Sequence, residues 1–212
     1  MVKVVMASDV VSPFCWMACH QVEQAIAQCP DVDVELELMP FQVSPGLPQD
    51  YSFAQYQRDY MVRTFGSMTA VEDMLQQVTT MGLQHGCEFH LDKITVWPNS
   101  KLAHGLWALG ESAEQRWALH KSICQAHFQL GLNLNDMTVL QHIGERQQLE
   151  PGLVQQRLQD DAYINDILTR TETTRKLDIG SVPTIIVDGK YRVNGVAGRD
   201  QLAATILAAL AA

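Results

Sequence analysis

The sequence is poor in basic residues and has no cluster of them. Lys and Arg together number 15 against 24 Asp and Glu, so the formal net charge is −9. No run of five or more basic residues occurs in the 212-residue chain. Because binding to the phosphate backbone of a nucleic acid depends on clustered Lys and Arg, this charge balance argues against a nucleic-acid partner.

Long apolar runs are also missing. A membrane-spanning helix shows about 18 or more consecutive apolar residues, and no such run occurs here. The apolar run from Val2 to Ala7 is soon followed by Asp9, which leaves too little for a secretory signal. We therefore expect no membrane contact and a cytoplasmic location. A mature periplasmic chain that has lost its signal is the alternative.

The cysteines form neither a disulfide framework nor a metal site. The five cysteines, Cys15, Cys19, Cys29, Cys87 and Cys124, are odd in number and irregularly spaced, so we expect reduced thiols. Cys15 and Cys19 are four residues apart on one predicted helix, where Cβ atoms lie about 5–6 Å apart. A disulfide needs about 3.8 Å, so this pair could bond only if the helix unwound. No second Cys or His pair has zinc-ligand spacing nearby, and we expect no metal.

The sequence does have apolar material for a large core. Hydrophobic residues make up 47% of the chain, enough for one large domain or for a small domain with an insertion. Apolar patterning predicts a strand over residues 2–8 and a helix over 13–28. Alternating apolar and acidic residues predict a half-buried strand over 32–38. A crossover helix between two strands indicates a parallel β-α-β unit.

The middle of the chain is predicted to be helical. Helices are expected over residues 53–65, 68–85, 101–110, 113–130, 136–147, 151–159 and 161–177. Asp136 and the Glu150-Pro151 pair are helix-start signals, and only a short piece near 95–98 looks extended. An all-helical block of this length, followed by strands, is best interpreted as an insertion.

Strand character returns after this block. Residues 183–187 read as a strand, Asp188-Gly189 is a two-residue hairpin signal, and 190–194 is the return strand. A closing helix rich in Ala and Leu is predicted over 199–211. The last part of the chain is therefore a β-β-α unit.

The stretch between the first strand and the first helix carries the candidate chemistry. Ser12 is a good N-cap, because its hydroxyl can accept from a free amide of the first turn. Pro13 suits the first helical position, where no N–H is needed. Cys15 lies in the first turn, where the helix dipole favours a thiolate. The apolar stripe of the helix places Cys15 on the core side, however, and a plain buried core cysteine is the alternative interpretation.

The order β-α-β, helical block, β-β-α resembles the DsbA-like branch of the thioredoxin superfamily. The resemblance implies an α/β protein with a thioredoxin fold (βαβ…ββα) and a large all-helical insertion. The thioredoxin-like domain would comprise residues 1–50 and 178–212, and the helical insertion subdomain would comprise residues 51–177.

Several short motifs are similar to those of the FrnE-type subfamily, the predicted dithiol-disulfide isomerases. They are Pro40-Phe41-Gln42, Asn99 to His104, Ala126-His127-Phe128 and Val182 to Gly195. The resemblance implies a cis peptide between Val182 and Pro183, in a loop that faces the first helix. It also implies that Asn99 and His104 line the cleft. The substrate-binding residues that it implies are Pro13, Phe14, Trp16, Asn99, His104, Val182 and Pro183, with Phe14 and Trp16 as an apolar rim.

One position departs from the redox-active members of this family. They carry Cys where this chain has Ser12, so the motif here is Ser-x-x-Cys. The related kappa-class glutathione transferases and 2-hydroxychromene-2-carboxylate isomerases have Ser at this position, and in them the serine meets the glutathione thiol. Ser12-Pro13-Phe14 resembles that version, whereas Cys15-Trp16 resembles the oxidoreductase version.

We expect a DsbA-like, FrnE-type thiol-disulfide oxidoreductase homologue whose catalytic residues are Ser12 and Cys15. Because Ser12 breaks the dithiol pair, its redox work would be monothiol through Cys15 or would use glutathione. The alternatives are a kappa-type glutathione-dependent transferase or isomerase that uses Ser12, and a non-catalytic peptide-binding or chaperone-like protein.

The expected partner is a thiol-containing peptide or small molecule such as glutathione, and no tightly bound cofactor is expected. Amides at the start of the last helix, Gly198 to Asp200, could bind a glutathione carboxylate. The oligomeric state is left open by the sequence.

Overall fold

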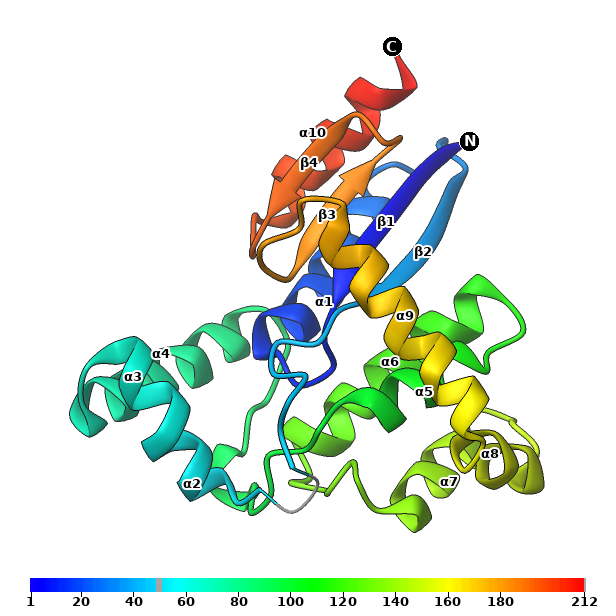
Figure 1. The fold of residues 1–212 in the computed structure, drawn as a ribbon. Coiled ribbons are helices and arrows are strands. Elements are labelled where there is room, and N and C mark those ends of the chain that lie inside the picture. The colour runs from blue at the N-terminus through cyan, green and yellow to red at the C-terminus, as the bar shows by residue number, and fades with distance from the viewer. Residues whose placement is uncertain (49–50, 212) are drawn as a thin grey trace.

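A computed structural model describes residues 1–48 and 51–211 (Figure 1). The described strands form a four-stranded sheet in the order β2-β1-β3-β4. The strands are β1 (Val2–Ser8), β2 (Val34–Pro40), β3 (Thr184–Val187) and β4 (Tyr191–Asn194). β1 is parallel to β2 and antiparallel to β3, which is antiparallel to β4. This is the sheet of a thioredoxin fold, with its first strand in an interior position.

The predicted strands are confirmed, with a shift in β2. This strand begins at Val34 rather than at Val32. The two preceding residues form its entry turn: the Val32 N–H donates to the Cys29 carbonyl (3.0 Å), and the Asp33 carbonyl accepts from the Val2 N–H (2.7 Å). The alternation of apolar and acidic residues in the sequence therefore begins in this turn, two residues before the paired strand.

Two helices pack against each other beside the sheet. They are α1 (Pro13–Ala27), the crossover between β1 and β2, and α10 (Arg199–Leu210), which follows β4. α10 also contacts β1, β3 and β4. In Figure 1 the two ends of the described chain lie at the same end of the molecule, remote from the helical part.

The segment between β2 and β3 is helical, as predicted. Its elements are α2 (Phe53–Tyr56), a π-helical turn (Gln57–Met61), α3 (Val62–Phe65), α4 (Met68–Gln84), a 3-10 turn (Leu91–Lys93), α5 (Lys101–Ala108), α6 (Ala113–Phe128), α7 (Met137–Arg146), α8 (Pro151–Leu158) and α9 (Asp161–Lys176). Within the described residues it adds no strand to the sheet. The extended piece predicted near 95–98 forms one bridge, between Ser52 and Val96.

Local signals explain where these helices begin. The Ser52 hydroxyl and the Gln55 side chain form a reciprocal capping box at α2. The Asp136 carboxylate accepts from the Thr138 N–H (2.8 Å) at the start of α7, and Pro151 occupies the first position of α8. The predicted helix over 53–65 is present but is interrupted by the π-helical turn.

One hydrophobic core joins the sheet to the helical segment. Met6 of β1, Met17 of α1 and Ile185 of β3 are fully buried, and so are Leu106 of α5 and Phe128 of α6. Burying a side chain of this size contributes about 1.5–3 kcal/mol. The helical segment is therefore held on the sheet by shared apolar contacts.

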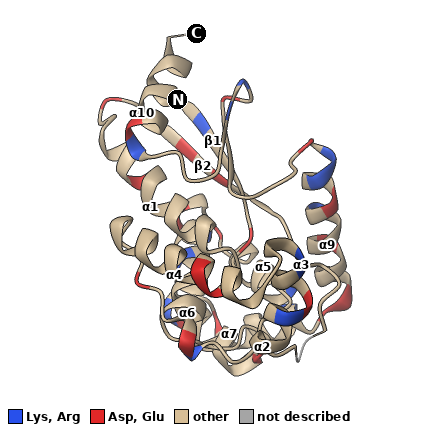
Figure 2. Cartoon of the chain, turned by 90° about the vertical axis from the view of Figure 1, so that its left-hand side faces the viewer, with Lys and Arg blue, Asp and Glu red and all other residues tan. Residues whose placement is uncertain are grey.

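Surface features agree with the composition. In the view of Figure 2, Lys and Arg are scattered among Asp and Glu rather than gathered on one element. Over residues 1–48 and 51–211, no helix combines the length and the apolar character needed to cross a membrane. The predicted boundary between residues 50 and 51 and the terminal residue 212 involve positions outside the described residues, so the division into domains stays a prediction.

Candidate functional site

Ser12 lies between β1 and α1, at the N-cap position of α1. Its backbone is extended (φ −98°, ψ 116°), and its carbonyl accepts from the Cys15 N–H (3.0 Å). The predicted side-chain cap is wrong, because the hydroxyl makes no hydrogen bond to an amide of the first turn. The hydroxyl instead interacts with the Cys15 thiol and lowers the pKa of that thiol. Ser12 and Cys15 therefore form a side-chain pair.

The Cys15 thiol is completely buried on the core side of α1, as predicted. Burial raises its pKa to about 11 and outweighs the hydrogen bonds with the Ser12 and Ser8 hydroxyls, which favour the thiolate. The expectation that the helix dipole would favour a thiolate here is therefore not met in the folded protein. At neutral pH Cys15 is a protonated and inaccessible thiol.

A buried polar cluster lies behind Cys15. The Ser8 hydroxyl is 2.7 Å from His120 Nε2, and His120 Nδ1 is 3.5 Å from Cys19 Sγ and 3.8 Å from Cys124 Sγ. Burial lowers the pKa of His120 to about 3, so the ring is neutral. No partner for His120 was predicted, because Ser8 and Cys19 precede it by 112 and 101 positions.

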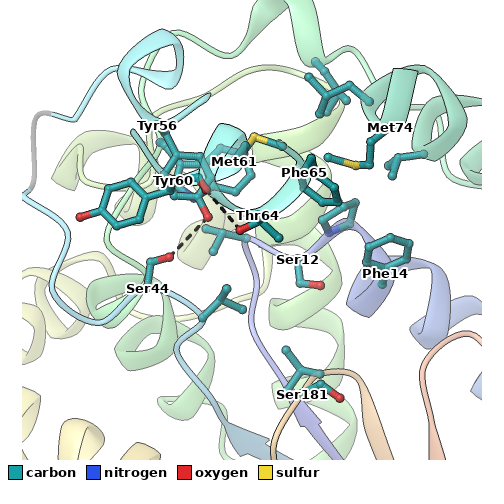
Figure 3. Close-up of a pocket in the computed structure, with 18 of the residues that line it drawn as sticks. Ser12, Phe14, Ser44, Tyr56, Tyr60, Met61, Thr64, Phe65, Met74 and Ser181 are labelled. Carbon is teal, nitrogen blue, oxygen red and sulfur yellow. Dashed lines mark hydrogen bonds between the residues drawn. The ribbon is translucent and has the colours of Figure 1, made fainter. Parts of the chain in front are cut away.

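A cavity of about 540 Å³ opens beside Ser12 (Figure 3). It lies between the start of α1, the loop before β3 and the segment from α2 to α4. Four of the predicted site residues line it: Ser12, Pro13, Phe14 and Val182. In Figure 3, Ser12 lies between the side chains of the helical segment and Ser181. Cys15 is not part of the lining, so the cavity wall offers an oxygen where redox-active relatives would offer a sulfur.

The helical segment supplies a stacked aromatic wall. The Trp97 ring stacks on Phe53 (centroids 5.0 Å apart) and on Tyr56 (4.6 Å), and Tyr56 stacks on Tyr60 (5.4 Å). The outer ring of the stack is open to solvent, since Tyr60 is 41% exposed, and Phe65 of α3, which also lines the cavity, is 43% exposed. Exposed aromatic rings around a concave site are typical of a surface that binds an apolar ligand.

Two predicted site residues lie just outside the cavity. Pro183 is buried, and its peptide bond with Val182 is cis, as predicted. Trp16 is nearly buried, with its ring centroid 5.3 Å from that of Phe89 and 6.2 Å from that of Phe128. Phe128 lines the cavity, so Trp16 supports the wall from behind rather than forming its rim.

Asn99 was expected to line the cleft, but it holds a loop instead. Its Nδ2 donates to the carbonyls of Pro45 (3.2 Å) and Leu47 (2.9 Å), and its Oδ1 accepts from Gln42 Nε2 (2.9 Å). These bonds use the buried amide and fix the loop after β2, which carries Ser44 to the cavity wall. Asn99 therefore shapes the site without facing it.

His104 is likewise buried and does not line the cavity. Its Nε2 lies 3.0 Å from the Phe41 carbonyl oxygen and 3.4 Å from Asp9 Oδ1, and its Nδ1 accepts from Trp107 Nε1–H (2.9 Å). An accepting Nδ1 on a neutral ring means that Nε2 carries the proton. Asp9 is also buried and accepts from the Val43 N–H (2.7 Å). This pair connects the turn before α1 to the loop after β2.

The start of α10, where a glutathione carboxylate was expected, forms hydrogen bonds with side chains of the protein itself. The Gly198 N–H donates to Gln21 Oε1 (3.4 Å), and the Asp200 carboxylate accepts from Gln28 Nε2 (3.0 Å). These residues are not part of the cavity lining, so the predicted role gains no support from the geometry.

Most of the residues that line the cavity were not predicted, and they include Tyr60 and Arg175. Asp9, which accepts from the Val43 N–H and lies beside His104, was not predicted either. A signal for Asp9 was available, since an acidic residue directly follows an apolar strand that ends at the candidate motif. Tyr60 and Arg175 lie in ordinary polar helical sequence, with no local pattern that distinguishes them from surface residues.

The sequence matches the family of DSBA-like thioredoxin domains over residues 3–207. Because the match spans nearly the whole chain, this protein belongs to that family. A relative is the uncharacterised protein YwbO of Bacillus subtilis (strain 168), which is 26% identical over 196 residues, 91% of this chain and 90% of the relative.

Solved structures share the fold. A probable DsbA oxidoreductase from Streptomyces coelicolor has a TM-score of 0.87 at 19% identity, over 100% of this chain and 91% of that one. A 2-hydroxychromene-2-carboxylate isomerase has a TM-score of 0.71 at 15% identity, over 99% and 96%. The cytosolic disulfide reductase DsbM from Pseudomonas aeruginosa, solved with GSH, has a TM-score of 0.68 at 13% identity, over 99% and 100%.

Proposed function

We propose that this DsbA-like protein is a glutathione-dependent transferase or isomerase of the kappa type, in which Ser12 holds the glutathione sulfur. The observation that carries the proposal is the difference in accessibility between Ser12 and Cys15. The Ser12 side chain lines the cavity, whereas the Cys15 thiol is fully buried behind it and is protonated at neutral pH. A foreign thiol can thus meet a hydroxyl at a helix start, but no accessible sulfur of this motif.

The chemistry follows from this placement. The positive end of the α1 dipole and a hydrogen bond from the Ser12 hydroxyl both stabilise a thiolate over a thiol. The proton lost by glutathione goes to solvent, and the thiolate electron pair forms a C–S bond with an electrophilic carbon of a second substrate. In a transfer reaction, the bond from that carbon to the leaving group breaks, and its electron pair departs with the leaving group. In an isomerisation, a π bond of the substrate breaks as the C–S bond forms, and the C–S bond breaks again when the thiolate leaves the product. The aromatic wall formed by Phe53, Trp97, Tyr56 and Tyr60 suits an apolar second substrate.

Two neighbours in structure support this proposal by their chemistry. One is named an isomerase of 2-hydroxychromene-2-carboxylate, and the other, DsbM, was solved with GSH. DsbM is described as cytosolic, and the five cysteines of this chain are free and buried. Both observations support a proposed location in the cytoplasm, where thiols stay reduced and glutathione is abundant.

A monothiol oxidoreductase of the FrnE type, acting through Cys15, is the second candidate. The hydrogen bonds of the Ser12 and Ser8 hydroxyls with Cys15 favour its thiolate and support this role. The role requires the start of α1 to open, because the thiol is fully buried. A non-catalytic peptide-binding or chaperone-like protein would use the same cavity without activating a thiol.

The test measures the pKa of the thiol of bound glutathione. Wild-type protein should bind glutathione in calorimetry, and ultraviolet titration should show that the pKa of the bound thiol lies below that of free glutathione. A hydrogen bond to a charged group is worth about 1.5–3 kcal/mol, so Ser12→Ala should raise the pKa of the bound thiol by roughly one unit or more.

Ser181→Ala is the matched control, because it removes another hydroxyl from the lining. It should leave the thiol pKa unchanged. Binding without any pKa depression would favour the peptide-binding candidate. Absence of binding, combined with alkylation of Cys15 in the folded protein, would favour the monothiol oxidoreductase.

A further inference from the structure

The cavity beside Ser12 has a single charged residue among the described residues that line it. This residue is Arg175, in the last turn of α9. The other lining side chains carry no charge, and they include Tyr60, Met61 and Phe65. Arg175 is exposed to solvent, so its charged end can stay hydrated while the side chain borders the apolar lining.

Contacts within the protein hold the guanidinium in place without neutralising it. Its central carbon lies 4.3 Å from the centroid of the Phe41 ring, and one of its nitrogens donates to the Gln42 carbonyl. Among the described residues, no carboxylate forms an ion pair with Arg175. By contrast, Arg170 on the same helix is paired with Asp166 (2.7 Å). Arg175 therefore keeps its charge and most of its donors available.

We propose that Arg175 binds the carboxylate of an apolar carboxylic acid, the second substrate that shares the cavity with the thiol. The aromatic and methionine side chains of the α2–α3 segment cover the apolar body, and the planar guanidinium accepts the carboxylate in a forked arrangement. This inference rests on the proposed function for the identity of the co-substrate, but the binding of the acid can be tested without glutathione.

The test compares an acid with its uncharged analogue. Phenylbutanoate and phenylbutanol share an apolar body, and calorimetry in the absence of glutathione measures the affinity of each. Wild-type protein should prefer the acid by about ten-fold, the effect expected for a charge-assisted hydrogen bond at a partly solvated site. Arg175→Gln should abolish that preference while leaving the affinity for the alcohol unchanged.

Two further variants sharpen the result. Lys176→Gln removes a charge from the adjacent position, which does not line the cavity, and should keep the preference for the acid. Arg175→Lys retains the charge but loses the fork, and should keep only part of the preference. Thermal unfolding of each variant checks that the fold is intact, and the comparison of acid with alcohol in wild type needs no variant.

Equal affinity for acid and alcohol in wild-type protein would overturn the inference. A preference that survives Arg175→Gln would also overturn it, as would a loss of glutathione binding in Arg175→Gln with acid binding unchanged, because Arg175 would then serve the thiol. Failure of the proposed function would be a separate result. In that case the pKa of the glutathione thiol would be the same with and without the protein, whatever the outcome with phenylbutanoate.

Discussion

At the scale of single residues, the feature that matters is the hydroxyl of Ser12, at the position where the redox-active members of the family carry a cysteine. Ser12 lies at the cavity wall, and the sulfur of the motif, that of Cys15, is fully buried behind it. A two-electron exchange of thiols requires a second sulfur to resolve the mixed disulfide. The absence of an accessible pair at this helix start therefore limits dithiol chemistry.

Restoring the sulfur should restore that chemistry. Ser12→Cys creates a Cys-Pro-Phe-Cys motif at the start of α1, with the new thiol on the cavity wall and Cys15 as its resolving partner. We expect the variant to gain catalysis of insulin reduction by dithiothreitol, measured as turbidity, over a nearly inactive wild type.

The double variant Ser12→Cys/Cys15→Ser is the control, and it should lose most multiple-turnover activity. Strong activity in wild type would contradict the argument, because it would mean that another thiol resolves the disulfide. No gain in Ser12→Cys would mean that the cavity no longer accepts a protein disulfide.

The buried thiol should also make stability depend on alkaline pH. Burial raises the pKa of Cys15 from 9.0 to about 11. A thiol whose folded pKa is raised stabilises the protein fully below its unfolded pKa, and that contribution is lost as pH rises through the folded pKa. The free energy of unfolding should therefore fall between about pH 9 and about pH 11, by an amount on the order of 2–3 kcal/mol from this group.

Urea unfolding at several alkaline pH values checks this prediction. Cys15→Ala should be less stable than wild type at neutral pH, because it leaves a small cavity, but its stability should fall less steeply with pH. Parallel curves for the two proteins would show that Cys15 does not titrate in this window.

At the scale of elements, a buried pair connects two loops that shape the cavity. Asp9, directly after β1, accepts from the Val43 N–H and lies next to His104 of α5. The loop after β2 is held further by Asn99. Residues expected to touch substrate thus position the backbone around it, and they do so through bonds that bring β1, β2 and α5 together.

Breaking this connection should cost stability. Asp9→Ala leaves the buried Val43 N–H without its acceptor and removes the carboxylate beside His104, whose Nε2 keeps the Phe41 carbonyl as an acceptor. We expect a loss of about 2 kcal/mol in the free energy of unfolding. Asp200→Ala, which removes an exposed carboxylate, should change stability by less than about 0.5 kcal/mol. Urea denaturation measures both variants, and similar values for the two would contradict a structural role for Asp9.

At the scale of the whole molecule, the cavity lies between a well-packed sheet and a less buried helical edge. β1 has fully buried side chains such as Met6, whereas the π-helical turn and α3 have no buried residue. Local opening is easiest where few apolar contacts are made. The side of the cavity formed by residues 57–65 is therefore the side that should adapt to a ligand.

Hydrogen exchange followed by mass spectrometry tests this asymmetry. Amides of residues 57–65 should exchange faster than those of β1 and α5, and phenylbutanoate should slow exchange in 57–65 while leaving α5 unchanged. If exchange at 57–65 were as slow as in β1, or were unaffected by the ligand, this side of the cavity would not be the side that adapts.

Much of the architecture was accessible from local patterns. The strands, α1, the helical block, the hairpin at Asp188-Gly189 and the cis peptide before Pro183 were all predicted from neighbouring residues or from the family resemblance. These features depend on periodicity, caps and turn residues, which act over a few positions. The places of Ser12, Pro13, Phe14 and Val182 on the cavity follow from the same topology.

The roles of the remaining site residues were decided only by the tertiary structure. Asn99 and His104 form hydrogen bonds with loops instead of lining the cavity. This role was not predicted, because their partners, Leu47 and Phe41, lie 52 and 63 positions away in the sequence. Arg175 reaches the cavity through contacts with a loop 133 positions earlier. From the sequence alone, the start of α1 was predicted to be the candidate site, and the structure has a cavity there. Which side chains face that site, and which are sealed behind it, depended on long-range packing, because burial and charge pairing are properties of the assembled core.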